Sequence, residues 1–254
     1  MTARLLTIPF SHYCEKARWA ADYQGFAYRE EKYLPGAHLV PVRRSHGRTL
    51  PILVTETTTL KDSTDILQYL DARAPSSVRL YPSDPTERRE VDALEELFDA
   101  RLGRATRLYA YHHGLPFPDS LCRVMAPSMS SLQRFAFRVA LPLLGPQIRR
   151  RYRIDDASAS SAAATIHEIF AEVSTRLDGK QYLVGNRFSA ADLTFAALAA
   201  PSIMPPGHPA YASDLDREPP GLRAWAQSLR ATPAGAHVLR MYREHRLAAT
   251  AAAA

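Results

Sequence analysis

The sequence predicts an α/β N-terminal part followed by an all-helical C-terminal part. Between residue 3 and about residue 77, short apolar runs of strand type alternate with helical patterns, which indicates a small unit built around a four-stranded mixed sheet. From Pro85 to about Leu247, apolar residues recur with helical spacing only. The periodicity changes at Leu80-Tyr81-Pro82, so we expect the two parts to join there.

The first strand and the first helix meet between residues 8 and 14. The apolar run that begins at Leu5 ends at Pro9, Ser11 is a good N-cap, and alanines propagate a helix towards Gln24. The backbone N–H groups of a helix N-terminus lack intrahelical partners, so the stretch from Ser11 to Cys14 favours an anion. That anion is either a bound thiolate or the deprotonated form of Cys14 itself.

A second strand at residues 26–33 leads into an irregular, basic loop at residues 34–48 with room for one short helix. Several side chains of this loop can bind a carboxylate: His38, Arg43, Arg44, His46 and Arg48.

A third strand at residues 49–54 carries Pro51 near its start, and residues 57–60 are its expected hairpin partner. We expect the peptide bond before Pro51 to be cis, a conformation that folded chains keep at few sites. The sequence Asp62-Ser63-Thr64-Asp65 then caps a helix that runs on to Arg73. A second helix N-terminus, rich in hydroxyls, thus follows Pro51 closely.

In the C-terminal part we expect helices at residues 87–112, 119–144, 158–177, 189–199, 221–230 and 233–246. The second of these is expected to break at Pro127 and to end at Gly145-Pro146. Ser189 and Asp192 form a capping box, so we interpret Asp192 as structural and not as a general base. The alanine-rich tail at residues 248–254 is expected to be disordered.

The charge of the chain is basic but diffuse. The net charge is +6, yet only four of the 32 basic residues are lysines, and the one dense cluster is Arg149 to Arg153. We interpret this cluster as a solvated helix end in preference to a nucleic-acid or anionic-membrane contact, because no nucleic-acid motif accompanies it. We therefore expect neither nucleic acid nor a membrane as a partner.

The two cysteines, Cys14 and Cys122, are expected to be reduced thiols, and neither has metal-ligand spacing. We expect no metal. The chain has no apolar run long enough to span a membrane, and its N-terminus does not resemble a signal peptide. These features predict a cytoplasmic protein.

Four motifs in register resemble one family. Ser-x-x-Cys at 11–14, Thr-Leu-Pro-Ile-Leu at 49–53 and Asp-Ser-x-x-Ile-Leu-x-Tyr-Leu at 62–70 resemble the thioredoxin-like N-terminal domain of the cytosolic glutathione transferases, with theta-, zeta- and omega-like features. Leu80-Tyr81-Pro82 is similar to the interdomain linker of that family, and residues 183–192 are similar to its core-helix signature. The resemblance implies a thioredoxin-like glutathione-binding domain at residues 1–77, a linker at 78–84, an all-helical substrate domain at 85–247 and a tail at 248–254.

The resemblance also implies the site and the partners. Glutathione is the expected co-substrate, with a small hydrophobic electrophile as the second substrate. Ser11 matches the position of the catalytic serine in theta- and zeta-like members and of the catalytic cysteine in omega-like members, while Cys14 matches the second cysteine of a glutaredoxin-like C-x-x-C. The expected glutathione-binding residues are His46, Leu50, Pro51, Asp62 and Ser63, and the residues nominated for the electrophile pocket are His12, Tyr13, Tyr109 and His112.

Three functions stay open at this point. In the first, Ser11 stabilises the glutathione thiolate for attack on an electrophilic carbon. In the second, Cys14 forms a mixed disulfide as a thiol transferase or reductase. In the third, the chain uses the fold only to bind a ligand or partner. A homodimer is also expected, with a surface made of the helix at residues 62–73 and an apolar stripe at Leu94, Leu97 and Phe98.

Overall fold

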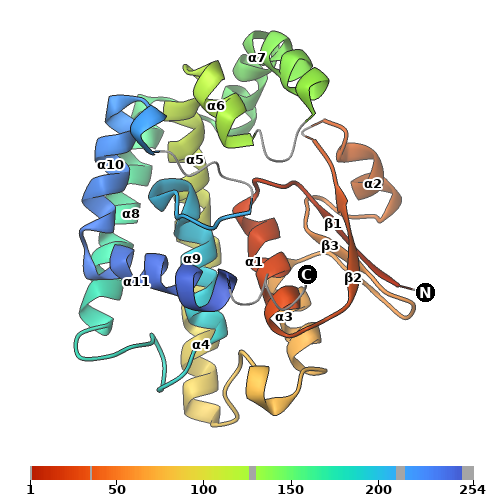
Figure 1. Ribbon diagram of the computed structural model, residues 1–254, viewed down its shortest axis with the longest axis vertical. Coiled ribbons are helices and arrows are strands. Elements are labelled where there is room, and N and C mark those ends of the chain that lie inside the picture. The colour runs from red at the N-terminus through yellow and green to blue at the C-terminus, as the bar shows by residue number, and fades with distance from the viewer. Residues whose placement is uncertain (1, 35, 126–129, 210–214, 248–254) are drawn as a thin grey trace.

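The computed structural model describes residues 2–34, 36–125, 130–209 and 215–247. A small sheet region and a larger array of helices lie side by side (Figure 1). The expected tail at residues 248–254 and the expected helix break at Pro127 lie outside the described residues.

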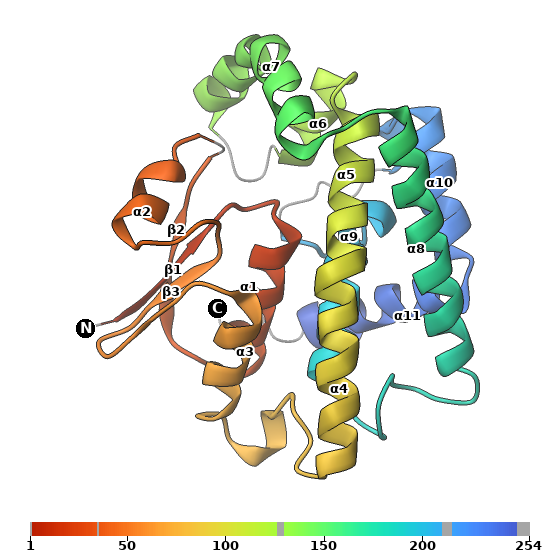
Figure 2. The same ribbon diagram turned by 180° about the vertical axis from the view of Figure 1, so that it is seen from behind.

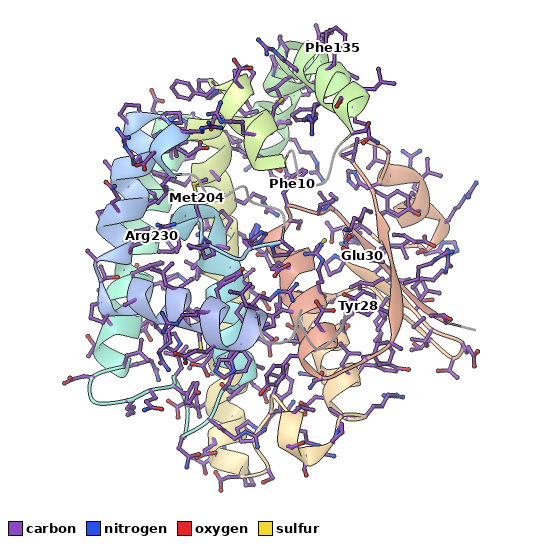
Figure 3. All side chains as sticks on the ribbon, viewed as in Figure 1. Phe10, Tyr28, Glu30, Phe135, Met204 and Arg230 are labelled. Carbon is purple, nitrogen blue, oxygen red and sulfur yellow. The ribbon has the colours of Figure 1, made fainter. Side chains whose placement is uncertain are left out.

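The sheet has four strands in the order β2-β1-β3-β4. Its strands are β1 (Ala3–Thr7), β2 (Tyr28–Lys32), β3 (Ile52–Val54) and β4 (Thr59–Leu60). β1 pairs in parallel with β2 and antiparallel with β3, and β3 pairs antiparallel with β4. The prediction of a mixed sheet is therefore confirmed. Figure 3 labels Tyr28 and Glu30 on the edge strand β2.

The helices of the sheet region are α1 (His12–Tyr23), α2 (Leu39–Arg44) and α3 (Ser63–Asp71). α1 and α3 cover the sheet face that is turned towards the helical region, whereas α2 covers the opposite face (Figure 1). Successive side chains of a strand point to opposite faces, so the paired Leu5 and Leu53 join the main core. The next pair, Leu6 and Ile52, packs with Val42 of α2 in a second cluster.

The helical region consists of α4 (Pro85–Leu97), α5 (Gly103–Gly114), α6 (Pro118–Met125), α7 (Ser131–Tyr152), α8 (Asp156–Arg176), α9 (Ala190–Ile203), α10 (Pro220–Arg230) and α11 (Pro233–Met241). One turn of π-helix, Phe98–Leu102, joins α4 to α5 in a single long rod (Figure 2). A second π-helical turn, Tyr242–Arg246, follows α11. Among the described residues no strand follows Leu60, which confirms the predicted change of periodicity.

One predicted helix end is wrong. The sequence Gly145-Pro146 was expected to end a helix, but α7 continues through it to Tyr152. A proline inside a helix removes one hydrogen bond to the carbonyl four residues earlier. Pro142 and Pro146 are both solvent-exposed, so water can reach the carbonyls that these prolines leave unpaired. The helix therefore tolerates both prolines.

The central helix α9 is buried along nearly its whole length. Its capping box forms as predicted between Ser189 and Asp192. The Asp192 carboxylate accepts the Leu183 N–H at 2.9 Å and the His237 Nε2–H at 3.0 Å. Its structural interpretation is confirmed, because each of these contacts holds chain segments together in the core.

The apolar stripe that was expected on a dimer surface is part of the core of the protomer. Leu94 and Phe98 are buried, and the ring of Phe98 lies 5.1 Å from that of Phe195 in α9. The expectation that these two side chains form a surface for a second subunit is wrong. An amphipathic helix can bury its apolar stripe against other helices of its own chain.

Gly103 is required by the close approach of α1 to α5. A Cβ atom at this position would lie 2.5 Å from the Tyr13 hydroxyl oxygen and 2.7 Å from Cζ of the same ring. Replacing a helical glycine by alanine usually stabilises by about 1 kcal/mol. We expect Gly103→Ala to destabilise instead, by about 1–3 kcal/mol, because it overpacks this contact. Denaturant unfolding measures the change.

Gly145→Ala is the matched control, because a Cβ atom at Gly145 in α7 meets nothing within 4 Å. This variant should be neutral or stabilising, by up to about 1 kcal/mol. Equal behaviour of the two variants would contradict the tight packing of Tyr13 against α5.

Candidate functional site

The sheet topology brings three separate segments together at one end of the strands. β3 runs antiparallel to β1 and its first residue Ile52 pairs with Leu6, so the start of β3 lies beside the end of β1. β4 returns antiparallel to β3 and leads directly into α3. Ser11, the Leu50-Pro51 peptide and the N-terminus of α3 therefore converge, although they are far apart in the sequence.

Ser11 is the N-cap residue of α1, as predicted, but its hydroxyl forms no cap hydrogen bond to the first turn. The Ser11 N–H donates to the Ile8 carbonyl at 3.0 Å, which closes the turn after β1. Ser11 is half-buried. A serine hydroxyl thus stands at a helix N-terminus, where the first amides of α1 favour a negative charge.

Cys14 lies one turn into α1 and is completely buried in the cluster of Leu6, Val42 and Leu50. The Ile8 N–H points at its Sγ at 3.4 Å. Burial raises the pKa of the Cys14 thiol, and hydrogen bonds from the Ile8 amide and the Ser11 hydroxyl offset only part of this effect. The thiol is therefore neutral at physiological pH and packs as a small hydrophobic side chain.

The peptide bond between Leu50 and Pro51 is cis, which confirms the prediction. Both side chains are buried, and the ladder between β1 and β3 begins only at Ile52. The backbone groups of Leu50 thus lie outside that ladder, beyond its last pair. An extended peptide can hydrogen-bond to such groups as an added strand.

At the N-terminus of α3, Asp62 is the N-cap and its carboxylate accepts the Thr64 N–H at 2.8 Å. Ser63 is the first helical residue and is buried, whereas His46 is exposed and has a left-handed backbone with φ 52°. The Lys61 ammonium donates to the His46 carbonyl at 3.2 Å. The sequence interpretation missed Lys61, although its place just before Asp62 was a usable signal.

His12 and Tyr13 hold α1 against the long helical rod. The Nε2–H of the buried His12 donates to the Gly103 carbonyl at 2.8 Å. The Tyr13 hydroxyl donates to the Asp99 carbonyl at 2.8 Å, and burial raises its pKa to about 12. His12 therefore anchors α1 to the helical region. Tyr13 makes a second such contact, and its ring is half-buried.

The nominated residues Tyr109 and His112 contact other helices of the helical region. The Tyr109 ring stacks on Trp225 of α10 with centroids 4.1 Å apart, and His112 Nε2 lies 3.5 Å from the Asp156 carboxylate. Tyr109 therefore packs helices of the helical region together. The face of α5 that approaches α1 contains Gly103, and a residue four positions further along an α-helix lies on the same face.

That face carries Arg107, which the sequence interpretation missed. The guanidinium carbon of Arg107 lies 5.9 Å from the centroid of the Tyr13 ring and 4.9 Å from that of Tyr152 at the end of α7. The Tyr111 ring lies 5.5 Å from Tyr152. Four-residue spacing from Gly103 was a usable signal for Arg107.

Within the described ranges, no three His, Cys, Asp or Glu side chains cluster as metal ligands. Nor does any helix of the described part combine the length and the apolar character needed to cross a bilayer.

A mixed β2-β1-β3-β4 sheet, a cis-proline before β3 and an all-helical C-terminal region define a two-domain protein of the thioredoxin-like glutathione transferase class. The family profile of the glutathione S-transferase N-terminal domain matches residues 5–78, and the profile of the C-terminal domain matches residues 132–228. The chain therefore belongs to the glutathione S-transferase family.

Solved structures of low sequence identity share the fold. A glutathione S-transferase from Methylobacterium radiotolerans in complex with glutathione sulfonate has a TM-score of 0.56 at 19% identity, over 94% of this chain and 95% of that one. The β-etherase LigF from a Sphingobium strain has a TM-score of 0.60 at 21% identity, over 94% and 99%. The theta class enzyme from Xanthomonas axonopodis pv. citri with glutathione bound has a TM-score of 0.53 at 21% identity, over 94% and 96%. No curated protein sequence matches the chain.

The buried His12 makes stability depend on pH. Burial, reinforced by Arg107, lowers its pKa from 6.5 to about 3. Between these values the unfolded chain binds a proton that the folded chain does not, so the contribution of neutral His12 is complete above pH 6.5 and is lost as the pH falls. The loss is about 1.4 kcal/mol per pH unit. We expect His12→Gln to weaken this dependence, as measured by urea unfolding at a series of pH values.

His167→Gln is the matched control, because His167 is exposed on α8. Urea unfolding of this variant over the same pH series gives the reference slope. An unchanged slope in His12→Gln would contradict a buried neutral imidazole.

Proposed function

We propose that the protein is a glutathione transferase in which Ser11 stabilises the thiolate of bound glutathione for attack on a hydrophobic electrophile. The observation that carries this proposal is the position of Ser11. Its hydroxyl caps none of the amides of α1. Ser11 stands at the N-terminus of this helix, at the same end of the sheet as the Leu50-Pro51 peptide. Two of the structurally similar proteins have glutathione or glutathione sulfonate bound, which supports glutathione as the thiol.

The energy required of Ser11 is modest. A free thiol with a pKa of about 8.5 is only a few per cent ionised at pH 7, and lowering its pKa by two units corresponds to about 2.7 kcal/mol. A hydrogen bond to a charged acceptor contributes about 1.5–3 kcal/mol, and a helix N-terminus adds about 0.3–1 kcal/mol. The hydroxyl and the dipole of α1 together are therefore sufficient.

The rest of glutathione is assigned to the neighbouring segments. The Leu50 backbone pairs with the cysteinyl unit by strand addition. The γ-glutamyl carboxylate lies at the N-terminus of α3 near Ser63, where backbone N–H groups favour an anion. Asp62 faces the ammonium group with the oxygen that it does not use for Thr64. His46 lies at this end of the site, because its carbonyl accepts a hydrogen bond from Lys61, the residue before Asp62.

We place the electrophile beside the Tyr13 ring, where Arg107 approaches from the helical region and in turn lies over the ring of Tyr152. Two aromatic rings favour an apolar or aromatic substrate, and the guanidinium favours a substrate with a negative or developing negative charge. One structural neighbour is a β-etherase, so aryl ethers belong in a substrate panel alongside generic electrophiles. Detoxification of such compounds in the cytoplasm is the role that we propose.

The alternative in which Cys14 is the nucleophile has little support. A nucleophilic cysteine needs an accessible thiolate, whereas Cys14 is fully buried and its pKa is raised. A non-catalytic binding protein remains the other alternative, and calorimetry with glutathione, with and without an electrophile, tests it directly.

We expect Ser11→Ala to reduce conjugation at neutral pH by roughly 10- to 1,000-fold, because the bound thiol loses one hydrogen-bond donor to its charged form. The affinity for glutathione should change little, so the loss should appear in kcat and should shrink as the pH rises towards the pKa of the free thiol. Steady-state kinetics against pH and calorimetry measure the two effects separately.

Cys14→Ala is the matched control at the same helix N-terminus. It should conserve conjugation, because the side chain is an interior packing group. Wild-type rates from Ser11→Ala, or loss of turnover in Cys14→Ala with its folded structure intact, would contradict the assignment to Ser11. Absence of glutathione binding by the wild-type protein would leave the non-catalytic alternative.

We also propose a homodimer, on the grounds of the family alone. Leu94 and Phe98 cannot supply its surface, since both are buried in the protomer. Light scattering at micromolar concentration should give twice the mass of the chain, and a monomer would refute the proposal.

A further inference from the structure

The outward face of α7 is apolar and is left uncovered by the residues that the structure describes. Four of its side chains are largely exposed: Leu132 by 78%, Phe135 by 67%, Val139 by 60% and Leu143 by 75%. Their spacing of three and four residues places them in one stripe along the helix. Figure 3 labels Phe135 at the outer edge of the molecule. Scattered exposed apolar residues are ordinary, but a continuous stripe of this kind marks an interaction surface.

The opposite face of α7 accounts for its attachment to the protein. Leu141 packs there with Leu115 and Ile154 in a small cluster that is separate from the main core. α7 lies at the periphery of the helical region, over α5 and α6 (Figure 1). The helix thus uses one apolar face for the fold and leaves a second one to solvent, so the outer stripe is not needed to hold α7 in place.

The charges of α7 select the kind of partner. Residues 131–152 contain arginines at 134, 138, 149, 150 and 151 and no acidic residue. Leu132 and Arg150 are separated by five full turns of 3.6 residues, so the apolar stripe continues into an exposed arginine. Asp119 of α6 pairs with Arg138 at 2.9 Å, which leaves the positive charge concentrated at the C-terminal end. A basic helix with a neighbouring apolar stripe is typical of helices that lie on anionic membranes.

A second copy of the chain fits this surface less well. Two α7 helices packed through their stripes would bring arginines of both copies together with no carboxylate on either helix. A lipid surface, in contrast, accepts a convex helix face without shape complementarity and supplies negative charge.

We propose that α7 docks the protein peripherally on an anionic lipid surface, with Leu132, Phe135, Val139 and Leu143 among the acyl chains and the Arg149 to Arg151 cluster at the headgroups. The proposal does not depend on the catalytic function. It departs from the expectation, drawn from the sequence alone, that the protein has no membrane partner. The physical reason is that the exposure of the stripe became apparent only in the tertiary structure.

Vesicle flotation with the full chain tests the proposal, using phosphatidylcholine vesicles with and without about one third phosphatidylglycerol. We expect binding to the mixed vesicles only, and loss of binding at high salt. The double variant Val139→Gln/Leu143→Gln should not bind. Arg150→Gln should lower the partition coefficient about five-fold, as for one basic residue near an anionic surface. Circular dichroism confirms that each variant is folded.

Arg89→Gln is the matched control, since Arg89 is an exposed helical arginine on α4. It should bind the mixed vesicles like the wild type. Equal weakening by Arg89→Gln and Arg150→Gln would overturn the proposal, because binding would then follow the net charge of the whole protein. Wild-type protein that binds neither vesicle type would also overturn the proposal. A dimer that Val139→Gln/Leu143→Gln dissociates would overturn it in favour of a second copy.

Discussion

The arrangement of the two regions depends on one fully buried lysine. Lys16 of α1 lies 2.7 Å from Glu95 and 2.6 Å from Asp99, both on the long helical rod, and it donates to Thr64 of α3 at 2.9 Å. Tyr81, in the connection between the regions, donates to the same Glu95 at 2.7 Å. Burying these charges is costly unless each finds its partner, and removing one partner of such a pair costs about 3–5 kcal/mol. The network therefore admits essentially one placement of α1 against the helical region.

A second buried network secures the other side of α1. Glu15 pairs with Arg18 and with Arg246, which comes from the last π-helical turn and also reaches Asp22 at 2.8 Å. Burial alone would raise the pKa of Glu15, but Arg246 and Arg18 lower it to about 2. The carboxylate is thus charged throughout the physiological range. Because both networks clamp α1, the position of Ser11 at its N-terminus follows from contacts with distant parts of the chain.

Much of the fold, and the two helix N-termini of the candidate site, could be predicted from local patterns. Strand and helix periodicity gives the order of the elements, and the capping residues Ser11, Asp62 and Ser189 mark helix starts where the structure has them. The cis peptide at Pro51 was also predicted correctly. Local patterns failed where packing decides. The stacking of Tyr109 on Trp225 and the approach of Arg107 to Tyr13 both join segments that are far apart in the sequence, so no local pattern predicts these contacts.

The sequence by itself determined which residues cap helices, where the periodicity changes and which hydroxyl stands at the first helix N-terminus, because these depend on neighbours within a few positions. Only the tertiary structure decided that Cys14 is a buried packing group, that Leu94 and Phe98 belong to the core and that the outer stripe of α7 is exposed. The local sequence around an apolar side chain can be the same whether the side chain is buried or exposed, because its burial depends on residues far away in the chain. Helix α7 illustrates this most clearly, because it is apolar on two sides and only its neighbours show which side the fold uses.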